Sequence, residues 1–372
     1  MAIILALMID PIWTICQDIQ RKEIDPSTLV DEIFAMQDVN ISYQDLYENY
    51  LQLLSNPLDL NQITDEQLRS LYLLDAVQIQ SFLKYRTENG PFVSTYELQT
   101  IPAFTPELIE RLAPFVTVND PTAVINQSIL KRIFQTQNNY LILRWARTIE
   151  SQRGYASDAD STTRYAGSPD QLYARFRAAK AGDFSVGFTL EKDAGESMLW
   201  NPAKKYFGFD YVSFHAQAIN KGNLKNIIVG DYQAQFGQGI ALGSVFGIGK
   251  NGETVTTTRR SNLGFSPYTS LYEAGYFRGA AITYQVTPQL FLHTMYSNRG
   301  RDGNLTQDTL QSTGVVSSFN YSGLHRTPNE LANRNSTAER NAASVLNFKN
   351  NQIDAGLLIH QTIFSAPLQR SP

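Results

Sequence analysis

The sequence predicts a multi-domain α+β protein, in which an all-α domain is followed by the antiparallel strands of an incomplete β-barrel. Two changes along the chain support this division. After Asn138 the spacing of apolar residues changes from about 3.6 to about 2, which is the change from helices to strands. The charge also changes sign: residues 1–120 carry 18 acidic and 6 basic side chains, whereas residues 121–372 carry 17 and 25. Such an asymmetry is typical of two separate bodies.

The length of 372 residues is sufficient for two domains. We divide the chain into a degenerate signal segment at 1–17, a helical domain at 25–120, a linker at 121–137 and barrel strands at 138–372. The linker follows Asn119-Asp120-Pro121. Cys16 is the only cysteine, so the sequence predicts neither a disulfide framework nor a thiolate metal site.

The N-terminus contains an apolar run at residues 2–9, much shorter than the ~20 residues that a membrane helix needs. The run is similar to the hydrophobic part of a secretory signal, although no basic residues precede it and Asp10 interrupts it. We interpret it as an export signal cleaved near Cys16, and leave open whether Cys16 is lipidated. The alternative is a buried N-terminal segment of a soluble protein.

Helix signals are clearest in residues 56–118, and a further helix is expected from Ser42 to about Leu54. Four signals mark helix ends. Two pairs of residues have the spacing of a capping box. A third signal is a capping residue directly before a proline that starts a helix, and the fourth is a stretch that ends the longest helix. These signals are Thr64 with Gln67, Ser94 with Glu97, Thr105-Pro106, and Asn89-Gly90-Pro91. They predict helices at residues 65–72, 76–89, 95–101 and 106–113.

This arrangement of helix, tight hairpin and helix, present twice, resembles the tandem helix-hairpin-helix module of bacterial competence DNA receptors. The resemblance covers about one sixth of the chain. The residues that carry it are Leu60-Asn61, Thr64, Glu66, Leu68, Leu71, Tyr85-Arg86, Glu88-Asn89-Gly90-Pro91-Phe92, Ser94, Glu97-Leu98 and Ile101. The resemblance implies that the hairpins bind DNA through backbone N–H groups at helix N-termini. The candidate nucleic-acid-binding residues are then Leu73, Leu74, Asp75, Ala103, Phe104 and Thr105.

The residues at the hairpins disfavour DNA as a partner. The family has glycine, a hydrophobic residue and glycine at each hairpin, but neither hairpin here contains glycine. Asp75 places a negative charge where a phosphate would lie, and Gln78 and Glu107 stand where the family often has lysine. Residues 56–118 carry eight acidic and four basic side chains, the wrong balance for a phosphate-binding surface. The alternative to DNA binding is a scaffold used for packing or protein contact.

The scaffold interpretation makes specific expectations about the two hairpins. Leu74 and Phe104 should point into the helical domain and pack in its core. Asp75 should cap the helix that begins at Ala76, and Thr105 should cap the next one. Neither hairpin should adopt the left-handed backbone conformation that glycine provides.

The second part of the chain contains segments in which every other residue is apolar, which predicts strands with one apolar face. The clearest are 184–190, 212–218 and 353–359, and further strands are expected near 139–150, 171–181, 225–236, 272–285, 288–298 and 343–350. Short turns at 181–182, 220–223, 287–288 and 350–351 alternate with long polar loops at 151–170, 192–207, 249–269 and 299–341. This alternation is typical of outer-membrane barrels. A soluble β-sandwich or large sheet is the alternative.

The order of signal segment, helix-hairpin-helix module and Tyr- and Gly-rich strands resembles a group of outer-membrane proteins from Bacteroidota-type bacteria. The stretches that carry this resemblance are Gly230–Gly239 and Gly323–Leu331. In the second stretch, Thr327, Pro328 and Glu330 predict a short helix within a long loop. Residues 365–372 form a turn-like tail instead of a closing strand, so we expect the sequence to be the front part of a longer barrel.

No pattern of catalytic or metal-ligating residues is present, so we expect no enzymatic activity, no cofactor and no metal. The histidines His215, His293, His325 and His360 are far apart and lack ligand spacing. The glycines before Lys250 do not have the spacing of a phosphate-binding loop.

The sequence therefore predicts a non-enzymatic outer-membrane β-barrel protein that acts in transport or envelope assembly. Its helix-hairpin-helix domain would lie in the periplasm as an interaction domain, and its partners would be outer-membrane lipid and an envelope protein. The alternative is a DNA-uptake receptor of the competence type.

Overall fold

The computed structural model describes twelve segments of the chain: residues 53–54, 57–71, 73–118, 128–136, 139–156, 160–180, 182–201, 206–243, 262–270, 272–307, 314–350 and 352–369. The signal segment predicted at 1–17, with Cys16, lies outside these residues. So do most of the helix predicted to end near Leu54 and residues 121–127 of the predicted linker.

The helical domain has the elements that its capping signals predict. They are α3 (Asp65–Ser70), α4 (Ala76–Asn89), the 3₁₀-helix η1 (Thr95–Thr100), α5 (Pro106–Leu112) and the 3₁₀-helix η2 (Ala113–Phe115). The third predicted helix is thus a 3₁₀-helix, which the sequence signals do not distinguish from an α-helix. Strand β1 (Leu58–Asp59) pairs in parallel with β2 (Val116–Thr117), so the two ends of the domain are joined. None of the helices in the described residues is long and apolar enough to span a membrane.

A single apolar cluster holds the helical domain together. Phe82 of α4 stacks on Phe92 with ring centroids 5.1 Å apart and on Phe104 at 6.5 Å. Arg86 donates to the backbone carbonyls of Leu60 and Ile63, both at 2.8 Å, and so attaches α4 to the segment that precedes α3. The buried members of the cluster are Leu60, Ile63, Leu68, Leu71, Leu74, Ile79, Phe82, Phe92, Leu98, Ile101, Phe104, Ile109, Leu112, Phe115 and Val116.

The second part of the chain forms one antiparallel sheet of ten strands. Nine of them follow one another as neighbours: β3 (Asn139–Arg147), β4 (Asp170–Lys180), β5 (Phe184–Lys192), β8 (Tyr211–Lys221), β9 (Leu224–Gln235), β11 (Phe277–Thr287), β12 (Leu290–Arg301), β15 (Thr337–Lys349) and β16 (Asp354–Phe364). The tenth, β10 (Gly264–Pro267), pairs with β9. The predicted strands are confirmed. Within the described residues the sheet is open, because β3 and β16 lie at opposite ends of the strand order.

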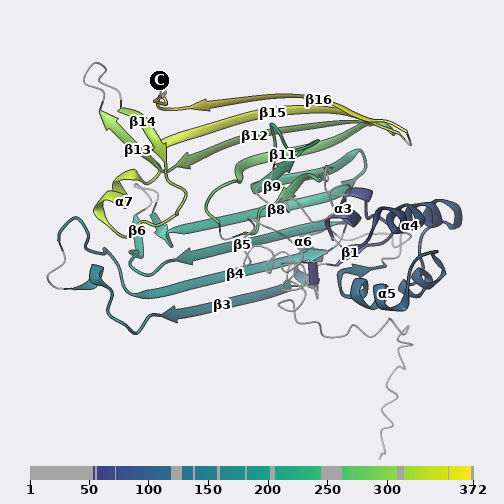
Figure 1. The fold of residues 1–372 in the computed structure, drawn as a ribbon, viewed down its shortest axis with the longest axis horizontal. Helices are drawn as coiled ribbons and strands as arrows, with labels where there is room; N and C mark the ends of the chain where they lie inside the picture. Colours follow the sequence, from purple (N-terminus) through teal and green to yellow (C-terminus); the bar gives the residue numbers. More distant parts are fainter. Residues whose placement is uncertain are drawn as a thin grey trace, which may run out of the picture.

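The two ends of the sheet differ, as the turn and loop lengths predict (Figure 1). Tight turns join the strands at one end. Long connections at the other end carry the hairpins β6 (Leu199–Asn201) with β7 (Tyr206–Gly208) and β13 (Gly303–Gln307) with β14 (Gly314–Phe319). The same end carries α7 (Pro328–Asn333), whose cap Thr327 and capping box with Glu330 confirm the predicted short helix.

The helical domain lies at the turn end of the sheet (Figure 1). Asn220, near the end of β8, donates to the Gln62 side chain at 2.6 Å. The short helix α6 (Ile129–Gln135), which lies in the segment interpreted as a linker, is fixed at the same end. Its Arg132 forms an ion pair with Asp183 in the β4–β5 turn, and Asp183 also binds Lys221 of β8.

The sheet has an unusual sidedness. Along β15, Asn341, Ala343, Val345 and Asn347 are buried, whereas the alternating residues from Ala342 to Phe348 are exposed. Buried polar side chains of the sheet are Arg175, Arg177, Ser185, Thr189, Ser213, His215, Thr283, Ser297, Asn341 and Asn347. Exposed apolar side chains are Leu141, Leu143, Trp145, Phe188, Phe214, Val229, Tyr284, Leu292, Tyr296, Leu346, Phe348, Leu357, Ile359 and Ile363. The polar face is therefore turned inward and the apolar face outward.

The inward face also carries one apolar cluster near its centre. Phe236 directly follows β9, and Phe265 lies in β10. Their rings pack edge to face with centroids 5.0 Å apart. They join Ile228, Ala281, Met295 and Val345 of the sheet in this cluster. The segment after β9 thus folds back over the inward face and covers part of it.

Candidate functional site

The first candidate site comprises the two hairpins of the helical domain, and both helix caps predicted there are confirmed. The Asp75 carboxylate accepts from the Gln78 backbone N–H at 2.8 Å, and the Gln78 side chain accepts from the Asp75 N–H at 2.9 Å. The Thr105 hydroxyl accepts from the Leu108 N–H at 3.3 Å. Side chains of the domain itself therefore occupy N–H groups that a bound phosphate would use.

The hydrophobic residue of each hairpin points into the domain, as expected. Leu74 is 9% exposed and Phe104 is 7% exposed, and both belong to the apolar cluster of the helical domain. Leu73 is half-buried and packs against the same cluster. Asp75, Ala103 and Thr105 are exposed. Of the six predicted site residues, these three are the ones that a ligand can reach.

The expectation that neither hairpin is glycine-like is wrong at Ala103. Ala103 has φ of +70°, in the left-handed region that favours glycine. For a residue with a Cβ atom, this conformation costs roughly 1–2 kcal/mol. The Gln78 side chain donates to the Ala103 carbonyl at 3.3 Å and so joins the first hairpin to the second. The second hairpin thus adopts a glycine-like conformation at a residue that is not glycine.

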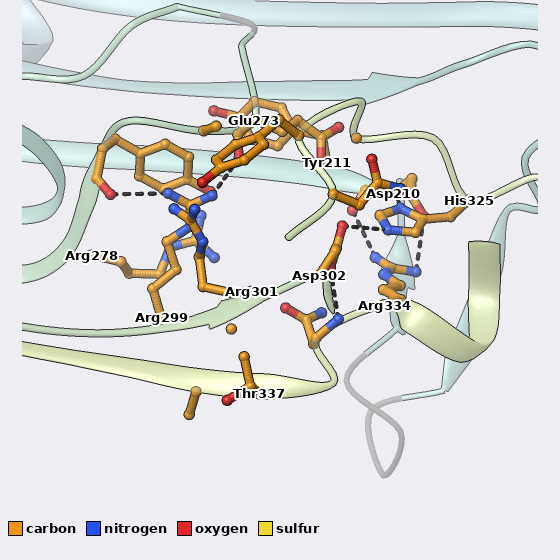
Figure 2. Close-up of a pocket in the computed structure, with 18 of the residues that line it drawn as sticks. Asp210, Tyr211, Glu273, Arg278, Arg299, Arg301, Asp302, His325, Arg334 and Thr337 are labelled. Carbon is orange, nitrogen blue, oxygen red and sulfur yellow. Dashed lines mark hydrogen bonds and ion pairs between the residues drawn. The ribbon is translucent and has the colours of Figure 1, made fainter. Parts of the chain in front are cut away.

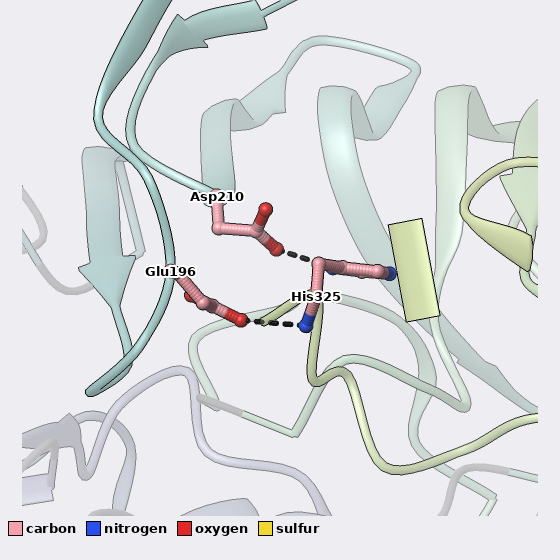
Figure 3. Close-up of side chains that lie close together, drawn as sticks. All are labelled: Glu196, Asp210 and His325. Atoms are coloured by element: carbon pink, nitrogen blue, oxygen red, sulfur yellow. Dashed lines mark hydrogen bonds and ion pairs between the residues drawn. The ribbon is translucent and has the colours of Figure 1, made fainter. Parts of the chain in front are cut away.

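The second candidate site lies at the loop end of the sheet, and the sequence analysis missed it. The His325 imidazole lies between two carboxylates, with Nδ1 2.5 Å from Asp210 and Nε2 2.8 Å from Asp302. Arg334, at the end of α7, binds the other oxygen of Asp210 at 2.8 Å. The Glu196 carboxylate accepts from the His325 backbone N–H at 2.9 Å (Figure 3). We call these five residues the ionic cluster.

The ionic cluster joins segments that are remote in the sequence. Glu196 precedes β6, Asp210 precedes β8, Asp302 follows β12, and His325 and Arg334 flank α7. The side chains of His325 and Asp210 are each 4% exposed. The cluster thus holds several long loops together in a setting that excludes most water.

Burial and charge shift the pKa values of the cluster in ways that follow from these contacts. Burial alone would lower the pKa of His325, but its hydrogen bonds to Asp210 and Asp302 outweigh this effect and raise the pKa to about 10. Burial of Glu196 and the nearby charge of Asp210 raise the pKa of the Glu196 carboxyl. At neutral pH, His325 is therefore an imidazolium that donates from both ring nitrogens.

Glu196, Asp210 and His325 also have ligand atoms close enough to hold a metal ion, all within 4.8 Å of one another. Their existing partners do not fit that role. Both ring nitrogens of His325 contact carboxylates, and a metal ligand must present an unprotonated nitrogen. The two Glu196 oxygens accept from the backbone N–H groups of His325 and Asp193. The donor set is that of an ion-pair network, and we assign no metal to it.

A cavity of about 500 Å³ adjoins the ionic cluster. Figure 2 shows Arg278, Arg299 and Arg301 on one side of it, and Asp210, Asp302, His325 and Arg334 of the ionic cluster on the other. Arg278 forms a two-pronged ion pair with the fully buried Asp231, at 2.6 and 2.8 Å. The residue before Asp231 is Gly230, where a Cβ atom would meet the Phe214 carbonyl at 2.2 Å, so this part of β9 requires glycine.

Two sequence stretches thus contribute to the same region. Gly230–Gly239 supplies Asp231 and Gly323–Leu331 supplies His325. These two stretches were the part of the site that the sequence could indicate. The partner of His325 could not be identified from the sequence, because Asp210 is separated from His325 by 115 residues.

Comparison with known proteins gives one match. Residues 55–117 match the helix-hairpin-helix motif family, a motif of nucleic-acid-binding and interaction domains. No curated protein and no solved structure matches the chain. The match confirms a helix-hairpin-helix motif in residues 55–117, which are about one sixth of the chain.

The conformation of Ala103 predicts that Ala103→Gly stabilises the protein. Glycine removes the left-handed strain, and the expected gain in the free energy of unfolding is roughly 0.5–1 kcal/mol, since glycine's greater unfolded-state freedom offsets part of the relief. Chemical denaturation of the intact protein measures it. Ala76→Gly at the exposed start of α4 is the matched control and should not stabilise. A loss of stability in Ala103→Gly would contradict the inference that the left-handed backbone at Ala103 is strained.

The ionic cluster predicts that stability falls as pH rises. The folded state raises the pKa of His325 from its ordinary value of about 6.5 to about 10. The stabilisation is therefore complete below about pH 6.5 and is lost as pH rises towards about 10. His325→Gln should reduce this pH dependence and cost about 3–5 kcal/mol at neutral pH, because buried carboxylates lose their partner. Unfolding measured across this range tests it, with His360→Gln as the control. An unchanged pH dependence in His325→Gln would contradict the assignment.

Proposed function

We propose that the chain is a non-enzymatic protein of the outer membrane, with its sheet forming a wall in the bilayer. The observation that carries this proposal is the sidedness of the sheet. In water, burial of apolar surface drives folding, so a soluble sheet buries its apolar face. In a transmembrane β-barrel the apolar face of the sheet contacts lipid and the polar face is turned inward.

The outward apolar face extends across neighbouring strands on both sides of β9. Backbone pairing aligns Leu141, Phe176, Phe188 and Phe214 across β3, β4, β5 and β8. It also aligns a second row across β11, β12, β15 and β16: Tyr284, Leu292, Leu346 and Leu357. An apolar face that extends over many strands is larger than the patches soluble monomers expose. Lipid is the partner that matches its chemistry.

Polar side chains on the inward face are paired with one another. Ser185 contacts His215 at 2.9 Å, and Thr283 contacts His293 at 3.0 Å. Asn341 accepts from Thr362 at 2.7 Å and contacts His360 at 3.0 Å. Such pairing removes most of the cost of placing polar groups in a low-dielectric interior. The inward face supports a packed interior or a lumen equally well, and we propose a role in transport or envelope assembly.

The helical domain supports the interaction part of the proposal. It lies at the turn end of the sheet, which in outer-membrane proteins is the periplasmic end (Figure 1). Its hairpins are closed by their own caps, and its charge is negative. We therefore propose that it contacts an envelope protein from the periplasm.

A charged residue introduced on the outward face distinguishes a sheet that contacts lipid from a sheet that contacts water. Leu346→Arg places a cation in the centre of the apolar face, which should cost about 2–4 kcal/mol in a bilayer. On a water-facing sheet the same change should stay within about 0.5 kcal/mol. The measurement is urea unfolding of the full chain folded into phospholipid vesicles. Val77→Arg, on the exposed side of α4, is the control and should be neutral. Equal, small costs for both variants would refute membrane embedding.

DNA binding by the helical domain is the second candidate function, favoured by the family match and by the left-handed Ala103. The acidic charge and the occupied caps oppose it, so we expect no DNA binding. Electrophoretic mobility of duplex DNA at low salt, with intact protein up to about 100 µM, covers the range of weak non-specific binding. A mobility shift that disappears with added salt and increases in Asp75→Lys would instead assign DNA binding to the hairpins.

A further inference from the structure

Arg299 is one of five arginines that line the cavity beside the ionic cluster. Arg299 donates to the backbone carbonyls of Tyr276, at 3.0 Å, and Glu273. Its guanidinium lies 3.8 Å from the centre of the Tyr276 ring. These partners are neutral, and no ion pair among the described residues includes Arg299. Its cross-strand neighbour is Glu339, but the Glu339 carboxylate contacts Arg301 instead, so the Arg299 guanidinium remains open to an anionic group in the cavity.

Three of the other four arginines of the cavity have a carboxylate partner, and the fourth, Arg340, is exposed. Arg278 is paired with Asp231, and Arg301 lies 3.4 Å from Glu339. Arg334 and the His325 imidazolium balance Asp210 and Asp302. Burial and the nearby charge of Asp210 raise the pKa of Glu273 well above its ordinary value, which favours the uncharged carboxyl. After this pairing, the inner wall of the cavity keeps a net positive charge at Arg299.

Arg301 has the geometry of a second anion contact. Its guanidinium lies 5.3 Å from the Phe319 ring and 5.1 Å from the Tyr321 ring, which fix its orientation. The 3.4 Å separation from Glu339 is long for a charge-assisted hydrogen bond, so donors of Arg301 remain available. Arg299 and Arg301 project from the same face of β12, because they are two residues apart. Together they form a two-arginine wall.

The rest of the lining decides the kind of anion. Asn320, Asn335 and Thr337 line the cavity and offer hydrogen bonds but no charge, and 500 Å³ is several times larger than a phosphate ion needs. We propose that this cavity binds a small hydroxylated organic anion, a sugar acid or sugar phosphate, with its anionic group on Arg299 and Arg301. The site lies at the loop end of the sheet, and the inference does not depend on whether the sheet is embedded in a membrane.

Calorimetric titration of the intact protein in detergent tests the site with four probes: glucuronate, glucose 6-phosphate, inorganic phosphate and glucose. We expect saturable binding of at least one of the two sugar anions, and at least tenfold weaker binding of glucose and of inorganic phosphate. Equal binding of glucose would show that charge is not recognised. If inorganic phosphate binds as tightly as the sugar anions, the cavity is a simple anion site that does not recognise the sugar. No saturable binding of either sugar anion in the millimolar range would overturn the proposal.

Three variants locate the binding in the cavity. Arg301→Gln should weaken anion binding at least tenfold. Asn320→Asp should do the same without disturbing the fold, because the aspartate is isosteric and its carboxylate can still accept from the Ser322 N–H, as Asn320 does at 3.0 Å. Arg153→Gln, an exposed arginine outside the cavity, is the matched control and should bind normally. Unchanged binding in folded Asn320→Asp would place the anion elsewhere and refute the assignment.

Discussion

The sheet places its polar side chains inside and its apolar side chains outside, and most of the architecture follows from this constraint. A strand alternates its side chains between two faces, so one choice of register assigns every residue of the sheet to a side. The consistent pairing from β3 to β16 keeps Leu141, Phe188, Leu346 and Leu357 on the outward face. The inward face must then satisfy buried hydrogen-bonding groups, which it does through pairs such as Ser185 with His215.

The two ends of the sheet are stabilised by different interactions. At the turn end, Asp183 binds both Arg132 of α6 and Lys221 of β8, while Asn220 contacts the helical domain. At the loop end, the ionic cluster around His325 joins loops that are remote in the sequence. Buried ion pairs contribute little net stability compared with apolar packing, but they are strongly directional. The long loops are thus held in one arrangement, and the adjoining cavity has a defined shape.

The hairpins of the helical domain are closed by side chains of the domain itself. Asp75 and Thr105 supply oxygens to the helix N-termini in place of phosphate, and Phe104 fills the core. Ala103 keeps the left-handed backbone that the hairpin needs, at an energetic cost. The fold is maintained by its apolar cluster and by the contact of Gln78 with Ala103, neither of which requires DNA.

Features that depend on neighbouring residues can be predicted from the sequence alone. The structure confirms the predicted helix starts at Asp75, Ser94 and Thr105, the strands, and the alternation of short turns with long loops. Features that depend on distant residues are visible only in the folded chain. The pairing of His325 with Asp210 and the open guanidinium of Arg299 arise because the strand order brings remote loops together. The left-handed Ala103 was also beyond sequence reasoning, because packing of the hairpin against Phe82 and α4 overrides the preference of alanine for other conformations.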